Sequence, residues 1–190
     1  MIRTAEMTDA PAMKHIAALA YDKYVDQLDQ PPLPLLHDYE EVARAGNTYV
    51  LTIRQQVVGM VTFLTNADHL LLRNLAVLPA YQGQGLGRML VDFVEAEARR
   101  RKLLEVRLWT REEMIDNIRY YQGLGYRLTH RDVVDGCGRV YFCKTVQNAN
   151  GDEASHRVLS KPIALPQRQN KARRGEKNAR ERSRRVRQRG

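Results

Sequence analysis

Three closely spaced glycines follow a leucine-rich segment and precede a stretch in which apolar residues have helical spacing. They are Gly83, Gly85 and Gly87, and they lie within the sequence QGQGLGR of residues 82–88. Glycine lets a backbone take left-handed conformations and approach a ligand closely, with amide N–H groups turned toward it. The start of a helix adds about half a positive charge at the same place. The segment therefore predicts a loop that binds a phosphate or pyrophosphate group.

Two common phosphate-binding loops do not fit these residues. A nucleoside triphosphate loop requires Lys and then Ser or Thr after its last glycine, whereas Gly87 is followed by Arg88. A dinucleotide-binding loop opens a repeated strand-helix-strand unit, and the segment before Gly83 belongs to no such repeat. The pattern that remains is Q-x-x-G-x-G over residues 82–87.

The apolar residues of positions 1–146 alternate between strand spacing and helix spacing. Strands are expected at 2–5, 49–53, 57–63, 69–78, 103–109, 126–132 and 139–146. Helices are expected at 9–24, 37–45, 85–101 and 112–124. Pro31, Pro32 and Pro34 exclude a helix between the first two of these. This order of elements predicts a mixed α/β fold with at least one helical crossover.

In two motifs the chain resembles the GNAT superfamily of N-acetyltransferases. That family places its Q/R-x-x-G-x-G/A loop after the fourth strand, which is where residues 82–87 lie. The sequence YYQGLGY of residues 120–126 is similar to the aromatic pair and Y-x-x-x-G-F/Y that end the family's last core helix. The segment PPLP at 31–34 resembles one in small bacterial members of unassigned substrate. The resemblance covers residues 1–146 and implies a mostly antiparallel central sheet flanked by helices.

The resemblance implies acetyl-CoA as co-substrate, with its pyrophosphate on the loop amides and its pantetheine arm along the fourth strand, where the fourth and fifth strands separate. Asn117 and Tyr121 lie one helical turn apart and would face the pantetheine and the sulfur. Tyr121 is the implied proton donor to the leaving thiolate. The residues implied in holding the co-substrate are Leu75, Ala76, Val77, Gln82, Gly83, Gln84, Gly85, Leu86, Gly87, Arg88 and Asn117.

The implied reaction is direct transfer of an acetyl group to a primary amine, on a small molecule or a protein, in a ternary complex. An alkyl amine of pKa about 10.4 is almost fully protonated at pH 7, so presenting it neutral costs roughly 4 to 5 kcal/mol. Protonating the thiolate gains only about 2 kcal/mol. For the base, the resemblance implies a Glu at the tip of the fourth or fifth strand, here Glu105 on the fifth, or a chain of water molecules, with Asp38 and Glu41 as alternatives. A packing role remains open for Tyr121 and a solvated position for Asn117, while Tyr120 is expected only to pack.

The chain's net charge of +9 lies entirely in its last 40 residues. Residues 1–150 hold 18 basic and 18 acidic side chains, whereas residues 151–190 hold 13 and four. Residues 147–190 also lack aromatic side chains, so they predict a flexible tail without a core of its own. The arginine-rich stretch 171–189 fits a phosphate backbone, which favours RNA or the ribosome as partner, or a merely solubilising role. An acyl-CoA-binding module without turnover, tethered to RNA by this tail, is therefore the alternative function.

Several classes of protein are excluded by composition. The sequence has no run of 18 apolar residues and no apolar signal segment at its start, so no membrane association is expected and the cytoplasm is the expected compartment. Cys137 and Cys143 lack metal-binding spacing, and the pair His37 and Asp38 lacks a third ligand, so no metal is expected. Whether the chain forms a homodimer is left open, and the segment 31–39 is a candidate for acceptor specificity.

Overall fold

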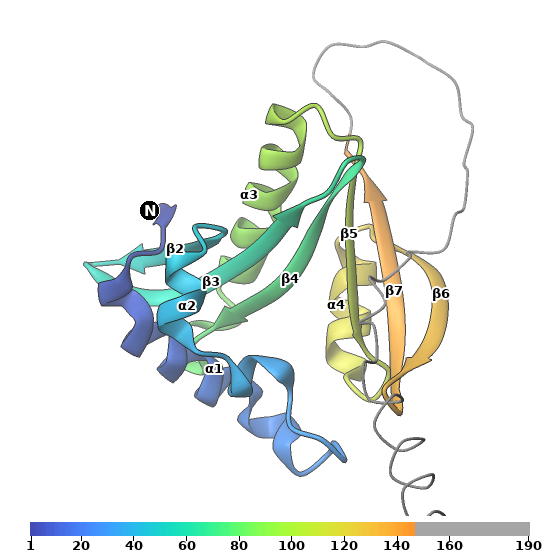
Figure 1. Ribbon diagram of the computed structural model, residues 1–190, viewed down its shortest axis with the longest axis horizontal. Coiled ribbons are helices and arrows are strands. Elements are labelled where there is room, and N and C mark those ends of the chain that lie inside the picture. The colour runs from blue at the N-terminus through green and yellow to red at the C-terminus, as the bar shows by residue number, and fades with distance from the viewer. Residues whose placement is uncertain (147–190) are drawn as a thin grey trace, which may run out of the picture. The chain divides into compact units, whose positions relative to one another are not determined.

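The computed structural model describes residues 1–146, and the expected tail of residues 147–190 lies outside the described residues. Within the described part, seven strands form one sheet in the order β1-β2-β3-β4-β5-β7-β6 (Figure 1). The strands are β1 Ile2–Thr4, β2 Thr48–Ile53, β3 Gln56–Thr65, β4 His69–Val77, β5 Glu105–Arg111, β6 Arg127–Val134 and β7 Cys137–Thr145. The α-helices are α1 Ala10–Val25, α2 Tyr39–Arg44, α3 Leu86–Arg100 and α4 Ile115–Gly123. The mixed, mostly antiparallel sheet flanked by helices is confirmed.

Every helix and strand expected from the sequence occurs, with ends that differ by a few residues. One difference lies in the proline-rich segment, which forms a short 3-10 helix, η2 (Leu33–Leu36), where no helix was expected. Pro34 stands in its first turn, where a missing N–H costs no hydrogen bond. Proline therefore excludes an α-helix here but not a single tight turn.

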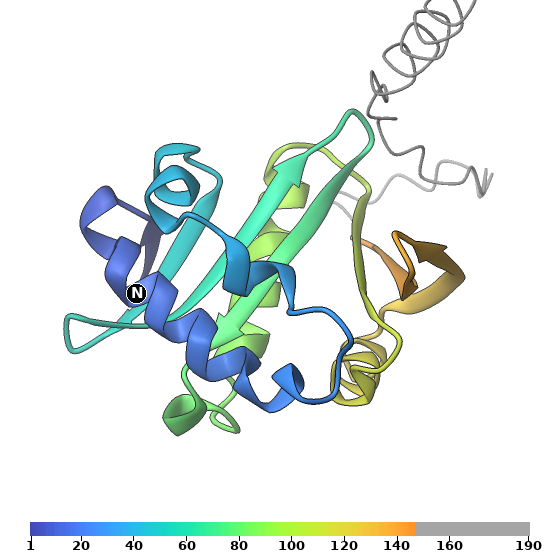
Figure 2. The same cartoon turned by 60° about the horizontal axis from the view of Figure 1, so that its bottom comes forward.

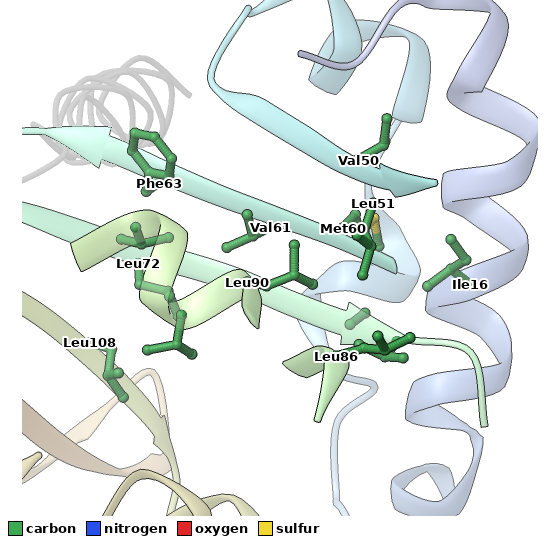
Figure 3. Packing of buried hydrophobic residues seen from close by; sticks show 14 of the residues in the cluster. Ile16, Val50, Leu51, Met60, Val61, Phe63, Leu72, Leu86, Leu90 and Leu108 are labelled. Atoms are coloured by element: carbon green, nitrogen blue, oxygen red, sulfur yellow. The ribbon is translucent and has the colours of Figure 1, made fainter. Parts of the chain in front are cut away.

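The two faces of the sheet are covered by different helices. Figure 2 shows α1 and α2 over one face and α3 over the other. The apolar stripe of α3, which includes Leu90 and Val94, is fully buried against the sheet. On the opposite side Ile16 of α1 is buried in the same core as Met60 (Figure 3). These layers hold β3 and β4 rigidly at the centre of the domain.

The fourth and fifth strands are parallel and pair over only part of their length. Residues His69–Leu72 pair with Glu105–Leu108, and beyond that point the two strands diverge (Figure 1). On its other edge β4 stays paired with β3 up to Val77, with an irregularity that leaves Arg73 unpaired. The β5-facing edge of residues 73–77 therefore has no strand partner. Because unpaired backbone N–H and C=O groups favour a partner, this open edge suits an extended ligand.

Candidate functional site

The glycine-rich loop has the backbone conformation that its sequence predicts. Gly83 and Gly85 have φ of 75° and 80°, in the left-handed region that favours glycine. A Cβ atom on either residue would meet no atom within 4 Å, so conformation and not crowding requires glycine at both positions. Gly85 is the N-cap of α3 and provides no side-chain cap. The first amides of α3 are thus left for an anionic ligand.

A groove of about 410 Å³, here called the loop groove, runs from this loop along the open edge of β4. Nine of the eleven residues expected to hold the co-substrate line it: Leu75, Ala76, Val77, Gln82, Gly83, Gly85, Gly87, Arg88 and Asn117. The other two do not, because Leu86 is buried in the core and the Gln84 side chain donates to the Ala80 carbonyl. The structure therefore brings together in one groove two segments that are separate in the sequence.

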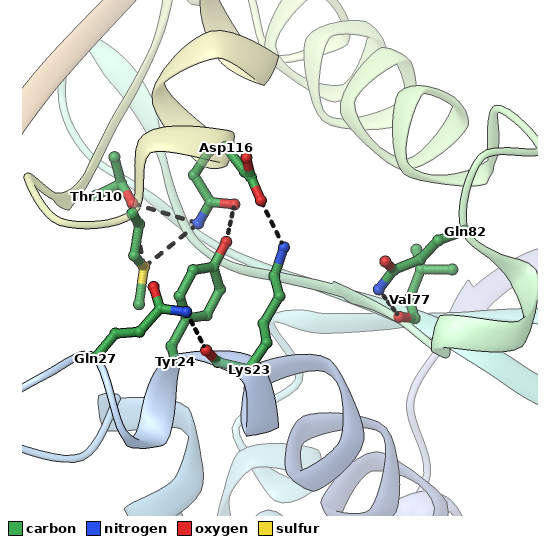
Figure 4. Close-up of polar contacts among 9 residues, drawn as sticks. Lys23, Tyr24, Gln27, Val77, Gln82, Thr110 and Asp116 are labelled. Carbon is green, nitrogen blue, oxygen red and sulfur yellow. Dashed lines mark hydrogen bonds and ion pairs between the residues drawn. The ribbon is translucent and has the colours of Figure 1, made fainter.

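The loop is tied to the open strand by a side chain. Gln82 Nε2 donates a hydrogen bond to the carbonyl oxygen of Val77 over 2.9 Å (Figure 4). This contact gives the first residue of the Q-x-x-G-x-G motif a structural role. It holds the start of the glycine-rich loop against the end of β4. Arg88 follows on the groove wall, with a side chain that is 68% exposed and 3.8 Å from Asp92. Such an exposed ion pair is weak, so Arg88 is free to turn toward a ligand.

The far wall of the loop groove is made where α1 and α4 meet. Lys23 Nζ lies 3.0 Å from Asp116 Oδ2, and the Tyr24 hydroxyl donates to Asn117 Oδ1 over 3.3 Å (Figure 4). The Asn117 amide also donates to Thr110 Oγ1 over 3.4 Å. Asn117 is therefore not a solvated helix residue. Its side chain links both helices to β5 at the point where the strands have separated.

A second space of about 190 Å³, here called the splay cavity, lies between the diverging ends of β4 and β5. The proline-rich segment from Gln30 to His37 forms one wall of it, and its role in acceptor specificity stays a prediction. Four residues line both the splay cavity and the loop groove: Tyr21, Leu75, Asn117 and Tyr120. The two spaces consequently adjoin at the middle of the open edge of β4.

A model of the acetyltransferase (GNAT) family matches residues 12–126. The chain belongs to this family. A search of curated protein sequences returned no match.

Solved structures of other GNAT proteins share the fold. The Escherichia coli ribosomal-protein-S18-alanine N-acetyltransferase is 23% identical, with a TM-score of 0.63, covering 82% of this chain and 98% of its own. The PaiA N-acetyltransferase of Thermoplasma acidophilum, solved in complex with coenzyme A, is 15% identical, with a TM-score of 0.63 and coverage of 74% and 96%. The yncA structure from Salmonella typhimurium, solved with its cofactor acetyl-CoA, is 19% identical, with a TM-score of 0.59 and coverage of 82% and 98%.

The two tyrosines of the second GNAT motif occupy different positions. Tyr121 lines the splay cavity but not the loop groove, and its ring packs edge-on against Tyr120 and Tyr126. Burial raises the pKa of Tyr121, so its hydroxyl keeps its proton at neutral pH. Tyr120, expected only to pack, lines both spaces, and burial raises its pKa to about 12. Its hydroxyl is buried without a hydrogen-bond partner among residues 1–146.

The structure does not bring Glu105 to this site. Glu105 opens β5 opposite His69, at the paired end of the two strands, and its carboxylate lies 2.7 Å from Arg107. The strands diverge only toward their carboxyl ends, so a residue at the start of β5 points into neither space. Asp38 caps α2 by accepting from the amides of Glu40 and Glu41, and neither Asp38 nor Glu41 lines the site.

Besides His37 of the proline-rich segment, three arginines that the sequence did not single out line the splay cavity. His37 lies exposed at its rim, where partial desolvation and the charge of Arg73 lower the pKa of the imidazole below its usual value. Arg73, Arg111 and Arg139 come from three different strands. A signal for one of them was present, since Arg73 is the one charged residue in a leucine-rich strand, HLLLRNLAV. The convergence of all three depends on the sheet order.

Within residues 1–146, no group of three or more His, Cys, Asp or Glu side chains is arranged to hold a metal ion. None of the helices in the described part of the chain is long and apolar enough to cross a membrane.

Proposed function

We propose that this protein is an N-acetyltransferase that moves the acetyl group of acetyl-CoA directly to a primary amine in a ternary complex. The observation that carries the proposal is that the loop groove and the splay cavity adjoin at Tyr21, Leu75, Asn117 and Tyr120. A donor in the groove and an acceptor in the cavity would meet there without crossing solvent. Holding two reactants in contact supplies a large part of the rate enhancement in such reactions.

The donor side uses backbone groups more than side chains. The amides of residues 83–88, at the uncapped start of α3, suit the pyrophosphate of acetyl-CoA. The open edge at Leu75–Val77 offers the pantetheine amides a ladder of hydrogen bonds like that of a neighbouring strand. This arrangement directs the thioester toward the divergence of β4 and β5, which is where the splay cavity begins.

On the acceptor side, the amine must lose a proton as its nitrogen forms a bond to the acetyl carbon. We assign acceptance of that proton, directly or through a water molecule, to His37, because partial desolvation and the charge of Arg73 lower the pKa of its imidazole and favour the neutral form that can accept a proton. The carbon–sulfur bond then breaks, and the thiolate leaves with a proton from the Tyr121 hydroxyl. Presenting the amine in its neutral form costs roughly 4 to 5 kcal/mol, whereas protonating the thiolate gains about 2 kcal/mol. Loss of His37 should therefore lower the rate more than loss of the Tyr121 hydroxyl.

Calorimetry with acetyl-CoA and a release assay for the CoA thiol test this function together. We expect stoichiometric binding of acetyl-CoA and release of thiol that depends on an added amine. Binding without thiol release across a broad set of primary amines would contradict the enzyme and support an acyl-CoA-binding module instead. Absence of binding would contradict both functions.

A further inference from the structure

The splay cavity is unusually rich in positive charge for a space that would receive an amine. Arg73 of β4, Arg111 of β5 and Arg139 of β7 line it, and Asp135 is the one carboxylate among its described lining residues. An ammonium group entering this cavity meets like charge, so the cavity favours the neutral form of an acceptor amine. The arginines therefore favour deprotonation of the acceptor amine. Their own positive charge, however, requires a negatively charged group to balance it.

One of the three arginines already has a structural partner. Arg111 Nη1 donates to the carbonyl oxygen of Gln30 over 2.8 Å, and its Nε lies 3.6 Å from Glu113. Arg111 is buried, with 9% of its surface exposed, and its hydrogen bond to Gln30 anchors the start of the proline-rich segment to β5. Its Nε is nevertheless buried without a hydrogen-bond partner within residues 1–146. A buried guanidinium with a spare donor indicates an acceptor atom that arrives with a ligand.

The other two arginines have no carboxylate within ion-pair distance among residues 1–146. Neither Arg73 nor Arg139 forms an ion pair with any residue in the described part of the chain. The Arg139 guanidinium lies 4.1 Å from the centre of the Trp109 ring, and its Nε is also buried without a partner. Stacking on Trp109 fixes the plane of the guanidinium, which leaves its outer edge for a planar or tetrahedral anion. Arg73 is exposed at the irregular point of β4.

We propose that the splay cavity selects a small amine that carries an anionic group, a carboxylate or a phosphate, bound by Arg139 and Arg73. The inference rests on the proposed N-acetyltransferase function and names its class of acceptor. Guanidinium groups bind such anions through paired hydrogen bonds that are about twice as strong as neutral ones. A cavity of about 190 Å³ suits a compact acceptor, with the anion held on the arginine side and the amine nitrogen near Tyr120.

Matched acceptors separate this preference from general amine reactivity. β-Alanine is compared with β-alaninamide, and phosphoethanolamine with ethanolamine, by CoA thiol release. We expect kcat/KM to be about tenfold to a hundredfold higher for the charged member of at least one pair. The pair that shows the larger ratio distinguishes a carboxylate from a phosphate. Equal rates for the charged and neutral members of both pairs would overturn the proposal.

Substitutions test which residues carry the preference. Arg139→Gln and Arg73→Gln should each reduce kcat/KM for the charged acceptor about tenfold or more beyond any reduction for the neutral acceptor, because only the charged acceptor loses a hydrogen-bonded anion contact. Arg139→Lys keeps the positive charge but cannot form the paired hydrogen bonds, so it should reduce kcat/KM for the charged acceptor less than Arg139→Gln does. Arg127→Gln is the matched control, because Arg127 is exposed on β6 and lines neither space. Equal losses in Arg127→Gln would also contradict the assignment.

A binding measurement without acetyl-CoA keeps this inference distinct from the proposed function. Trp109 is the sole tryptophan of the chain and lies against Arg139, so its fluorescence reports an anion bound there. β-Alanine or phosphoethanolamine should change the emission saturably in the wild type and not in Arg139→Gln or Arg73→Gln. If no acceptor is acetylated but this change occurs, the acetyltransfer proposal fails and the anion site stands. If neither charged compound alters the emission or is preferred in turnover, the anion site is refuted.

Discussion

The hydroxyl oxygen of Tyr120 lies 2.8 Å from the position that a Cβ atom would take on Gly87. This places α4 and the first turn of α3 in contact at the loop groove, with no space for a side chain at residue 87. The Cζ atom of Tyr120 is 3.6 Å from the same position, which is ordinary van der Waals distance. The hydroxyl alone therefore makes glycine necessary here, whereas Gly83 and Gly85 are required by their positive φ.

Gly87→Ala should lower the free energy of unfolding by about 1 to 3 kcal/mol, because the added methyl group overlaps the Tyr120 hydroxyl. It should also weaken acetyl-CoA binding, since both residues line the loop groove. The double variant Gly87→Ala/Tyr120→Phe should recover most of the lost stability, because only the ordinary contact remains. Denaturant unfolding of the two single variants and the double variant measures this. A double variant as unstable as Gly87→Ala would show that the contact is not the cause.

Gly85→Asp should weaken acetyl-CoA binding by at least about tenfold, because it places a carboxylate beside the expected pyrophosphate. Gly85→Asn is the matched control, since Asn and Asp both tolerate left-handed backbone and differ here only in charge. Both substitutions strain the backbone alike at the positive φ of residue 85, so a loss of affinity in Gly85→Asp beyond that in Gly85→Asn reflects the added charge. Calorimetry measures the affinity of both variants for acetyl-CoA. Equal affinities would contradict the assignment of the glycine-rich loop as the pyrophosphate site.

Tyr121→Phe should reduce kcat by up to about 30-fold while the affinity for acetyl-CoA stays within about twofold. The limit follows from the roughly 2 kcal/mol that protonation of the thiolate supplies at neutral pH. Burial raises the pKa of Tyr121, so the hydroxyl remains a proton donor across the neutral range. Tyr120→Phe serves as the comparison, because Tyr120 lines both spaces. An unchanged kcat in Tyr121→Phe would show that Tyr121 has a packing role and does not donate a proton.

His37→Gln should lower kcat/KM about a hundredfold and remove the acid limb of its pH profile. The pKa of His37 is lowered from its usual 6.5, so the imidazole is neutral above that range. Activity of the wild type should therefore fall as pH decreases through a value below 6.5, where the imidazole becomes protonated. Glu105→Gln and Glu41→Gln should retain the wild-type profile, since neither residue lines the site. Loss of the limb in Glu105→Gln would restore that carboxylate as the base.

Local patterns in the sequence were sufficient for the helices and strands and for the conformation of the glycine-rich loop. The spacing of Gly83, Gly85 and Gly87 between a strand and a helix predicted a loop of positive φ values at a helix start, which the structure contains. These features depend on a few neighbouring residues, because glycine conformation and helical periodicity are local properties. The same locality explains why the bounds of α3 differ from the prediction by one residue at each end.

The acceptor side depended on the tertiary structure. The sequence could not show that β4 and β5 pair only through Leu72 and Leu108, which keeps Glu105 away from the site. It could not bring Arg73 and Arg139 to one cavity, because that requires β7 to lie beside β5 ahead of β6 in the sheet. Parallel pairing and sheet order are contacts between residues far apart in the chain, and no local spacing encodes them. The sequence alone thus determined the loop and its helix, while the fold decided which charged side chains line the splay cavity.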